Sequence, residues 1–409
     1  MLYLVTYDDI RAAADRIADG IQRTPTLWSD WFSPAVGFDL FLKREHRQGT
    51  GSFKERGARN ALMLLDDQQK KAGVIAASAG NHALALAHHG KLLGVPVTVV
   101  MPRFAPIIKV ENCRRFGADI VLHGEHIGEC KEHATALAQE RGLSYINGYD
   151  DPEIIAGAGT IGLEMLDQVP DLDAIVVPVG GGGLIAGIAL AAKAIKPGIT
   201  IIGAEPAHAA SFTLALKHGK PVRADVQPTL ADGLAVPCVG DNAFAVAAPL
   251  IDEMIIVEED EIALAILRLV EMEKAVVEGA GAVGVAAALS GKLDAFKGKR
   301  VGTVLCGGNI DTTMLGRIIQ RGLAVDGRLC RFSAHISDRP GGLAAFTQVL
   351  AEQGVSVIDI AHDRVFASDE IASVSVECKV ETRNHEHIKS LKQTLGNAGF
   401  ETRFHDLPQ

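Results

Sequence analysis

Lys54 lies in segment 49–58, whose residue types and spacing could support covalent chemistry. Ser52 followed three residues later by Glu55 is a capping-box pattern, which predicts that a helix begins here and carries Lys54 in its first turn. A helix N-terminus disfavours a cation, so this placement should lower the pKa of the lysine and favour the neutral amine that a Schiff base requires. The alternative interpretation is an exposed lysine on a surface helix.

A second candidate segment is Ser78-Ala79-Gly80-Asn81-His82, which follows an expected strand and opens an expected helix. Backbone N–H groups at a turn from strand to helix bind anions, including a carboxylate. The side chain of Asn81 adds a donor and an acceptor at the same place. An ordinary turn, with Asn81 as a helix cap and His82 packed in the interior, is the alternative.

Four glycines, Gly180, Gly181, Gly182 and Gly183, precede an expected helix that starts at Leu184. Main-chain amides in such a loop can converge on a phosphate at the N-terminus of the helix. The pattern predicts a phosphate site without identifying the molecule that carries the phosphate.

The alternative interpretation is that the phosphate belongs to a bound dinucleotide. Gly181, Gly183 and Ala186 fit the GxGxxA fingerprint, and Glu205 follows after the next expected strand, where a ribose-binding acid is found in dinucleotide-binding proteins. Under this interpretation the chain is an NAD-binding oxidoreductase, and Lys54 has no function.

Cys306 begins a fourth segment, Cys306-Gly307-Gly308-Asn309. The thiol is expected at the carboxyl end of a strand, where open α/β sheets bind ligands. A small buried apolar residue is the alternative, because that is the usual role of cysteine.

The apolar pattern predicts the elements that position these four segments. Short β-branched runs alternate with amphipathic helical stretches over the first three-quarters of the chain, which is typical of doubly wound α/β architecture. The expected buried parallel strands are 74–77, 97–101, 120–122, 174–179, 200–204 and 301–306.

The pattern changes near residues 322–328, after which we expect a separate domain. Its expected elements are a strand at 330–336, a helix to about 353, a strand at 355–364, a turn at 367–370, a strand at 371–380, a helix at 385–397 and a strand at 400–405. The order βαββαβ is the ferredoxin-like plan.

Composition limits the classes of function. A formal net charge of -10 argues against nucleic-acid binding, which needs a basic face. The uncharged run 174–192 is interrupted by Pro178 and the glycines, so it should not form a membrane helix. Asp8 and Asp9 come too early for a signal peptide, and the six cysteines form no CxxC pair. We expect a cytoplasmic protein with reduced thiols.

Taken together, the ordered segments SFKERGA, SAGNH, GGGGL and CGGN resemble the fold-type II, tryptophan-synthase-β-like family of pyridoxal-phosphate (PLP) enzymes. Within it they are similar to the threonine/serine dehydratases. Segments 152–157, 231–233 and 278–282 also match, so the resemblance covers about residues 5–320. The tail, with Asp338-Arg339-Pro340-Gly341, resembles an ACT domain, a small amino-acid-sensing module.

The resemblance implies a function for each segment. Lys54 would carry PLP as a Schiff base and act as the catalytic base, with Phe53 beside the cofactor ring. Asn81 would bind the ring hydroxyl, and Cys306 would face the pyridine nitrogen. The phosphate would be held by Gly180, Gly181, Gly182, Gly183 and Leu184. The substrate carboxylate would be held by Ser78, Ala79, Gly80, Asn81 and His82.

The implied fold has two doubly wound open-sheet subdomains and an ACT-like domain. The large subdomain is expected at 1–48 and 145–322, the small one at 49–144, and the ACT-like domain at 329–409. The implied reaction converts L-threonine to 2-oxobutanoate and ammonia, and L-serine to pyruvate. Isoleucine or valine is the expected effector, and a homodimer or homotetramer is the expected assembly.

Departures from the family pattern bear on the choice of reaction and metal. Racemases of the family need a second acid/base, typically a serine at the position of Ala79, so a serine racemase is disfavoured. A divalent site in those relatives would use Glu205, the Ala209 carbonyl and an aspartate, where Ser211 stands. We therefore expect no tight divalent metal at these positions and leave a monovalent cation open. Two further functions stay open, a hydroxyaspartate dehydratase of the same family and a non-catalytic amino-acid sensor built around the tail.

Overall fold

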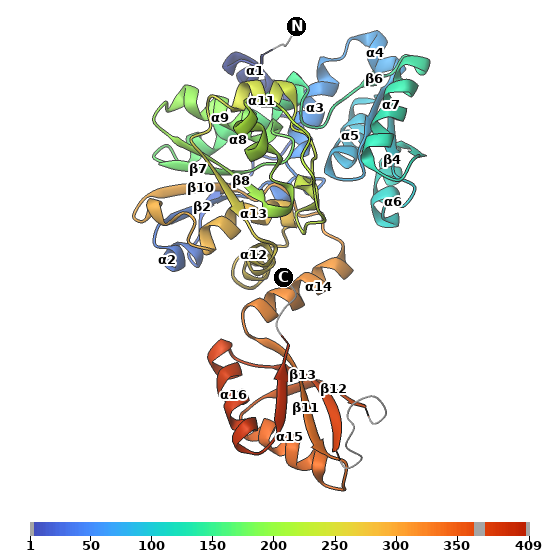
Figure 1. Ribbon diagram of the computed structural model, residues 1–409. Helices are drawn as coiled ribbons and strands as arrows, with labels where there is room; N and C mark the ends of the chain where they lie inside the picture. The colour runs from blue at the N-terminus through green and yellow to red at the C-terminus, as the bar shows by residue number, and fades with distance from the viewer. Residues whose placement is uncertain (1–3, 364–372, 406–409) are drawn as a thin grey trace. The chain divides into compact units, whose positions relative to one another are not determined.

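The computed structural model describes residues 4–363 and 373–405. The chain forms two compact units, Met1–Asp311 and Thr312–Gln409. Figure 1 shows the helices and strands of both units. The first unit contains two separate sheets, and the second unit contains one.

The larger sheet of the first unit has the strand order β1-β2-β10-β7-β8-β9. Its strands are β1 (Thr26–Trp28), β2 (Asp39–Lys43), β7 (Ala174–Pro178), β8 (Thr200–Pro206), β9 (Glu253–Val257) and β10 (Arg300–Val304). Neighbouring strands are parallel, except that β1 is antiparallel to β2. β7 and β8 lie where strands were expected, and β10 ends at Val304, before the predicted end at Cys306. β1, β2 and β9 were not predicted.

Helices pack on both faces of this sheet. The helices of this region are α1 (Tyr7–Ile17), α2 (Phe32–Val36), α8 (Pro152–Gln168), α9 (Gly183–Ile195), α10 (Ser211–His218), α11 (Asp241–Ala247), α12 (Glu259–Met272) and α13 (Gly279–Leu289). Figure 1 shows α8 and α9 on one side of the strands and α12 and α13 on the other. α8 and α9 approach so closely that a Cβ on Gly187 would lie 2.4 Å from the carbonyl oxygen of Ile155.

The long uncharged run 174–192 forms β7 and most of α9, separated by the glycine loop, as the sequence predicts. Within residues 4–363 and 373–405, no helix has the length and apolar character needed to cross a membrane.

The smaller sheet of the first unit has four parallel strands in the order β5-β4-β3-β6. They are β3 (Val74–Ala77), β4 (Val97–Met101), β5 (Asp119–Leu122) and β6 (Ser144–Tyr145), with helices α4 (Asp67–Ala72), α5 (Asn81–Leu93), α6 (Ile107–Arg115) and α7 (Ile127–Arg141). The two parallel-rich sheets with their helices confirm the predicted α/β architecture.

Helix α3 (Lys54–Leu64) packs against both α8 and α5, and so contacts helices associated with both sheets. Its contact with α8 runs through two glycines, because a Cβ on Gly157 would lie 2.6 Å from the Cα of Gly57. A larger side chain at either position would push the helices apart. The close contact therefore fixes α3, which begins at Lys54, against α8.

The predicted capping box at the start of α3 is wrong. The helix begins at Lys54 after Phe53, without a side-chain cap, and the Ser52 hydroxyl is buried without a partner. The carboxylate of Glu55 instead accepts hydrogen bonds from the Thr50 amide and from His89. The Glu55 carboxylate, which the sequence pattern assigned to the start of the helix, is therefore hydrogen-bonded to the preceding loop and to helix α5 instead.

The second unit contains α14 (Thr312–Val325), β11 (Leu329–Ser337), α15 (Gly342–Glu352), β12 (Ser356–Asp363), β13 (Ser373–Glu381), α16 (His385–Asn397) and β14 (Glu401–Phe404). The sheet is antiparallel with the order β12-β13-β11-β14, which is the predicted ferredoxin-like topology. Phe332, Phe346 and Leu391 lie in its core. The expected turn at 367–370 lies outside the described residues.

Candidate active site

Backbone and side-chain contacts bring three of the four predicted segments together around Lys54. The Nζ atom of Lys54 donates a hydrogen bond to the carbonyl of Gly148. The Phe53 amide donates to the Cys306 carbonyl at 3.0 Å, and Ser52 pairs with Gly307 in an isolated antiparallel bridge. The start of α3 is therefore held directly against the segment that follows β10.

The amine of Lys54 is surrounded by protein atoms, although part of the side chain is exposed. Burial is the largest cause of a lower pKa, which falls from 10.5 to about 8, and the nearby Cys306 and Glu278 oppose the shift. The sequence argument predicted the right direction but attributed it to the helix terminus. Desolvation is the physical reason, and it makes the neutral amine accessible near neutral pH.

Asn81 connects the two sheets through its side-chain amide. It is the first residue of α5, after Gly80, and its Nδ2 atom donates to Glu278 at 2.7 Å. Its Oδ1 atom accepts a hydrogen bond from Asn309 at 2.9 Å, and the same Asn309 amide donates to the Thr50 carbonyl at 2.7 Å. Asn81 therefore is not the helix cap of the alternative interpretation. It links the SAGNH and CGGN segments.

Glu278 is a residue of this network that the sequence argument did not select as a site residue. Its side chain is buried, and burial raises the pKa of its carboxyl to about 7, with a further contribution from Asp232. The available signal was an acid at the start of α13, a helix made of glycine, alanine, valine and leucine. An acid in such surroundings is retained only with specific partners.

The glycine loop leads into the uncapped N-terminus of α9. Helix α9 begins at Gly183, and Gly182 before it has φ +96 and no side-chain cap. A Cβ on Gly181 would lie 2.3 Å from the ring of Tyr149, and a Cβ on Gly183 would lie 2.2 Å from the Tyr149 carbonyl oxygen. The first N–H groups of a helix have no partner within the helix. Gly180 and Leu184, at the two ends of the loop, are also buried.

This loop is joined to Lys54 through two consecutive residues. The carbonyl of Gly148 accepts the hydrogen bond from the Lys54 amine, and Tyr149 packs against Gly181 and Gly183. The fourth predicted segment is therefore part of the same site.

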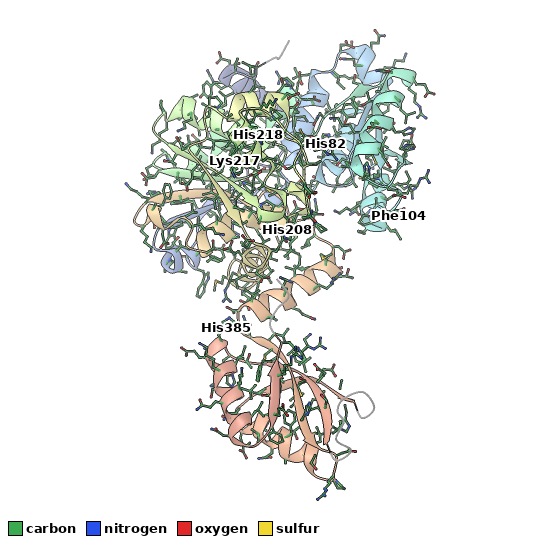
Figure 2. The ribbon with its side chains drawn as sticks, in the orientation of Figure 1. His82, Phe104, His208, Lys217, His218 and His385 are labelled. Carbon is green, nitrogen blue, oxygen red and sulfur yellow. The ribbon has the colours of Figure 1, made fainter. Side chains whose placement is uncertain are left out.

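The loop proposed to hold a carboxylate combines open space with one packed residue. A Cβ on Gly80 would meet no atom within 4 Å, and the Gly80 amide donates to the Ser78 hydroxyl at 3.3 Å. Ala79 packs against the apolar core of the smaller sheet. His82, which is labelled in Figure 2, is buried, and its Nε2 atom lies 3.2 Å from the carbonyl oxygen of Ile146. Burial lowers the pKa of its ring to about 3. His82 is therefore neutral and packed.

Cys306 is 3% exposed, and burial raises the pKa of its thiol well above the ordinary value. The group is thus a neutral thiol at neutral pH. It lies two residues after the end of β10, and its carbonyl accepts a hydrogen bond from the Phe53 amide. The thiol lies close enough to Lys54 for each group to affect the pKa of the other.

An ion pair links helix α6 to the segment between α10 and α11. Lys109 lies 3.1 Å from Asp232, which begins a short 3-10 helix, Asp232–Leu234. Both charges also act on the buried carboxyl of Glu278, Asp232 raising its pKa and Lys109 lowering it. This exposed pair is a contact between the smaller and the larger sheet regions.

Glu205 does not lie free for a ribose hydroxyl. Its carboxylate accepts hydrogen bonds from the Phe212 amide at 2.7 Å, from the Thr213 amide at 2.9 Å and from the Thr213 hydroxyl at 2.7 Å. Glu205 therefore caps the N-terminus of α10. The Ser211 hydroxyl donates to the Val236 carbonyl at 2.6 Å and so is also engaged.

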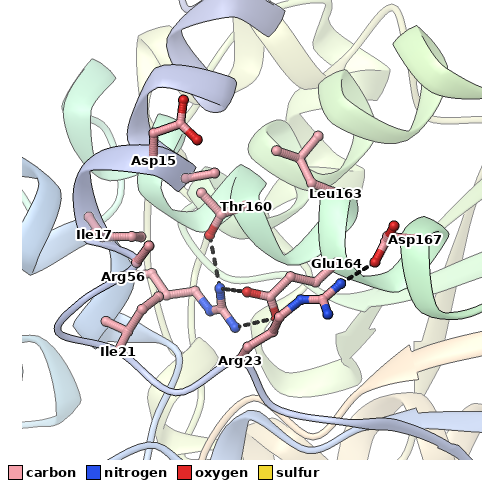
Figure 3. A pocket seen from close by; sticks show the side chains of 11 residues that line it. Asp15, Ile17, Ile21, Arg23, Arg56, Thr160, Leu163, Glu164 and Asp167 are labelled. Atoms are coloured by element: carbon pink, nitrogen blue, oxygen red, sulfur yellow. Dashed lines mark hydrogen bonds and ion pairs between the residues drawn. The ribbon is translucent and has the colours of Figure 1, made fainter.

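A separate pocket of about 430 Å³ lies between α1 and α8. Figure 3 shows Arg56, two residues after Lys54, in its wall with hydrogen bonds to Thr160 and Glu164. The buried Glu45 also pairs with the Arg56 guanidinium at 2.7 Å. None of the predicted site residues lines this pocket, and both of its arginines are paired, Arg56 with two carboxylates and Arg23 with Asp167.

Comparison with known proteins decides between the interpretations of the glycine loop. The family described as pyridoxal-phosphate dependent enzyme matches residues 17–307. The chain belongs to this PLP-dependent family. An L-threonine ammonia-lyase from Thermotoga maritima is 41% identical over 400 residues, covering 98% of this chain and 99% of that protein.

Two solved structures are similar to the larger part of this PLP-dependent enzyme. The processed form of threonine deaminase isoform 2 from Solanum lycopersicum has a TM-score of 0.74 at 39% identity, over 77% of this chain and 92% of that chain. Maize serine racemase also has a TM-score of 0.74 at 39% identity, over 79% of this chain and 99% of that chain. The fold is therefore shared by a deaminase and a racemase.

The residues present fit PLP. A buried lysine amine with a lowered pKa suits a Schiff base, and the uncapped glycine loop at α9 suits a phosphate. Asn81 has a second N–H on its Nδ2 atom beyond the one given to Glu278, so it can donate to another oxygen.

Replacing Glu278 with Gln should change how stability depends on pH. The folded-state pKa of about 7 lies above the ordinary value of 4.5, so the folded state holds this proton more tightly, and the group's contribution to stability falls as pH rises between those values. Glutamine cannot ionise and still offers an oxygen to Asn81. The variant should gain stability relative to the parent from about pH 5 to about pH 8, by on the order of 3 kcal/mol at most.

Unfolding midpoints of both proteins, measured without cofactor across this pH range, test the prediction. A stability difference that is the same at every pH would show that Glu278 keeps an ordinary pKa in the folded chain.

Proposed function

We propose that the chain is an L-threonine ammonia-lyase that converts L-threonine to 2-oxobutanoate and ammonia, and L-serine to pyruvate. The observation that carries the proposal is the buried amine of Lys54, next to a phosphate cradle and a neutral thiol. The similarity to the Thermotoga maritima enzyme extends over both units of the chain, which supports the same conclusion.

Lys54 is the proposed cofactor-binding residue and general base. Bound PLP withdraws electrons from the Cα–H bond of the amino acid. The neutral Nζ atom of Lys54 takes the Cα proton, and its lowered pKa keeps a useful fraction of the amine unprotonated near neutral pH. The Gly148 carbonyl orients this amine. The β-hydroxyl leaves with a proton as water, and the resulting enamine hydrolyses to the 2-oxo acid and ammonia.

The remaining proposed contacts follow from the same geometry. The amides of the glycine loop and Leu184 hold the phosphate, Phe53 lies beside the ring, and Asn81 donates to the ring hydroxyl. Cys306 faces the pyridine nitrogen. A neutral thiol cannot keep that nitrogen protonated as a carboxylate would, so a long-lived carbanion is disfavoured and rapid elimination is favoured.

The substrate carboxylate is proposed to bind at Ser78, Ala79, Gly80, Asn81 and His82. The open space at Gly80 and the start of α5 support this placement, since N–H groups at a helix N-terminus favour an anion. His82 contributes through its packing and backbone, because its ring is neutral and lies against the Ile146 carbonyl.

Lys54→Ala should abolish turnover of L-threonine. Removing the base and the covalent attachment together should lower the rate by at least about a thousandfold. The visible absorption band of lysine-bound PLP should also be lost, while the circular dichroism spectrum stays that of the parent. Release of 2-oxobutanoate by the variant at the parent rate would overturn the assignment of Lys54.

Ala79→Ser should add racemisation of serine. Racemisation needs a second acid/base on the cofactor face opposite Lys54. We propose that the methyl group of Ala79 lies on that face, where it cannot deliver a proton. This argument favours the lyase over the runner-up function, a serine racemase like the maize enzyme. Chiral chromatography after incubation with L-serine should give negligible D-serine for the parent and measurable D-serine for the variant. Abundant D-serine from the parent would instead support the racemase.

The second unit is proposed to contain an ACT-like regulatory domain at 329–409. Its ferredoxin-like sheet supports the assignment. We propose isoleucine or valine as effector, a homodimer or homotetramer as the assembly, and a monovalent cation as an optional ligand. The six free cysteines are compatible with the proposed cytoplasmic location.

Addition of isoleucine or valine should shift the dependence of rate on threonine concentration. A chain that ends before β11 should lose this response, because the proposed effector site lies in the second unit. Initial rates of both proteins over a range of each amino acid measure the effect. If the curve of rate against threonine concentration is the same with and without each added amino acid, only a structural function would remain for this unit.

A further inference from the structure

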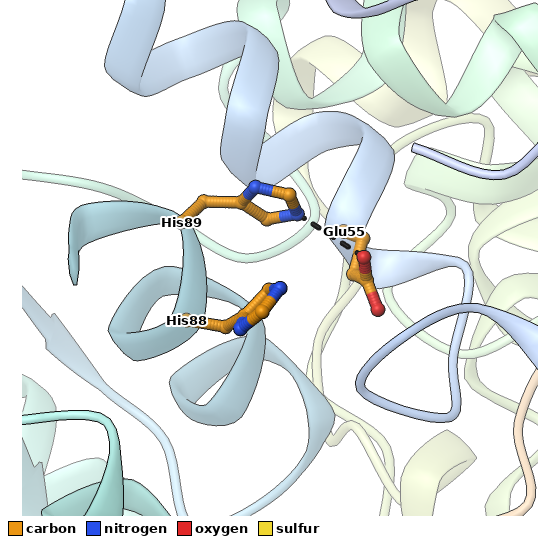
Figure 4. Close-up of side chains that lie close together, drawn as sticks. All are labelled: Glu55, His88 and His89. Carbon is orange, nitrogen blue, oxygen red and sulfur yellow. Dashed lines mark hydrogen bonds and ion pairs between the residues drawn. The ribbon is translucent and has the colours of Figure 1, made fainter. Parts of the chain in front are cut away.

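A cluster of three metal-binding side chains lies between α3 and α5, apart from the proposed PLP contacts. Figure 4 shows Glu55 from α3 facing His88 and His89 from α5. One donor atom from each residue lies within 4.8 Å of the other two. Glu55 and His89 are buried, and His88 is partly exposed.

We propose that Glu55, His88 and His89 form a site for a divalent transition-metal ion of the zinc class. Two imidazole nitrogens and one carboxylate oxygen would bind the ion, and water would occupy a fourth position on the exposed side. The proposal does not depend on the chemistry of Lys54, because none of the three side chains is a proposed contact of the cofactor or substrate.

The type of donor selects the class of metal. Imidazole nitrogen with a single carboxylate suits zinc and its neighbours, whereas calcium and magnesium prefer sites made of oxygen atoms. The Oε2 atom of Glu55 lies 3.2 Å from the Nε2 atom of His89. Ligands about 2.0–2.1 Å from a tetrahedral zinc ion are roughly 3.3 Å apart, so these two atoms already have nearly the required separation.

His88 completes the site and provides the entry path. Its ring makes edge-to-face contacts with the rings of His89 and Phe116, whose centroids lie 4.9 Å and 4.8 Å from its own. These contacts restrain the orientation of the His88 ring. Burial is the largest cause that lowers the pKa of His88, and a neutral imidazole has the free electron pair that a metal needs. Because the ring is partly exposed, an ion can approach from this side.

Three features of the surroundings should limit the affinity. The Nδ1 atom of His89 is buried without a hydrogen-bond partner, whereas metal-bound histidines normally donate from this second nitrogen. The positive charges of Arg59 and Lys91 lie close enough to act on His88. The other carboxylate oxygen of Glu55 already accepts a hydrogen bond from the Thr50 amide, so only one oxygen of this carboxylate is left for the ion. We therefore expect a dissociation constant on the order of micromolar rather than the much tighter binding of structural zinc sites.

The test is a zinc titration of the untagged, dialysed holoenzyme, with a chromophoric chelator as competitor. The parent should bind one zinc ion per chain in the micromolar range. His88→Gln should weaken this binding by about tenfold or more, because one of the three protein ligands is lost. Threonine turnover should be unchanged, since His88 is outside the proposed catalytic contacts, and this also reports that the variant is folded.

His126→Gln is the matched control. His126 lies 3.4 Å from a carboxylate oxygen of Glu129, so this pair offers the same donor types on an exposed surface. Among the described residues, no third His, Cys, Asp or Glu side chain completes a cluster with this pair. Its replacement should leave the zinc affinity of the parent unchanged. Absence of binding by the parent up to about millimolar zinc, or equal affinity of the parent and His88→Gln, would overturn the proposal.

Discussion

The amine of Lys54 is surrounded by protein atoms rather than by water, and this lowers its pKa to about 8. Desolvation disfavours the ammonium form, so the folded chain keeps available a neutral amine that a solvent-exposed lysine would have only at high pH. The other features of the site serve this group. The Gly148 carbonyl orients the amine, and the residue after it packs against the glycine loop at α9.

Holding that amine in place requires the two sheet regions of the first unit to be joined at a fixed distance. α3 approaches α8 through Gly57 and Gly157, where no side chain separates the backbones. Asn309 bridges Thr50 and Asn81 with a single amide group, and Asn81 continues the network to Glu278. A partly buried polar network of this kind is stable only when its members are satisfied, so it favours one arrangement of α3, α5 and α13.

Much of this architecture could be predicted from sequence because the informative segments are locally encoded. Strands 74–77 and 97–101 and helix 385–397 have the predicted limits, since each is a strong apolar or periodic run bounded by turns or caps. β1 and β9 were missed because both are short strands with exposed or half-buried positions. The capping box at Ser52 failed for a tertiary reason, as the Thr50 amide and His89 engage Glu55. Glu278 was missed because its partners are distant in sequence.

The central claim is that Lys54 carries the cofactor. Borohydride reduction of the holoenzyme fixes a lysine-bound PLP irreversibly, and proteolysis with mass spectrometry then locates the modified residue. The account predicts that the added mass is found on the peptide containing Lys54. Modification of a different lysine, with Lys54 unmodified in the fully active protein, would contradict it.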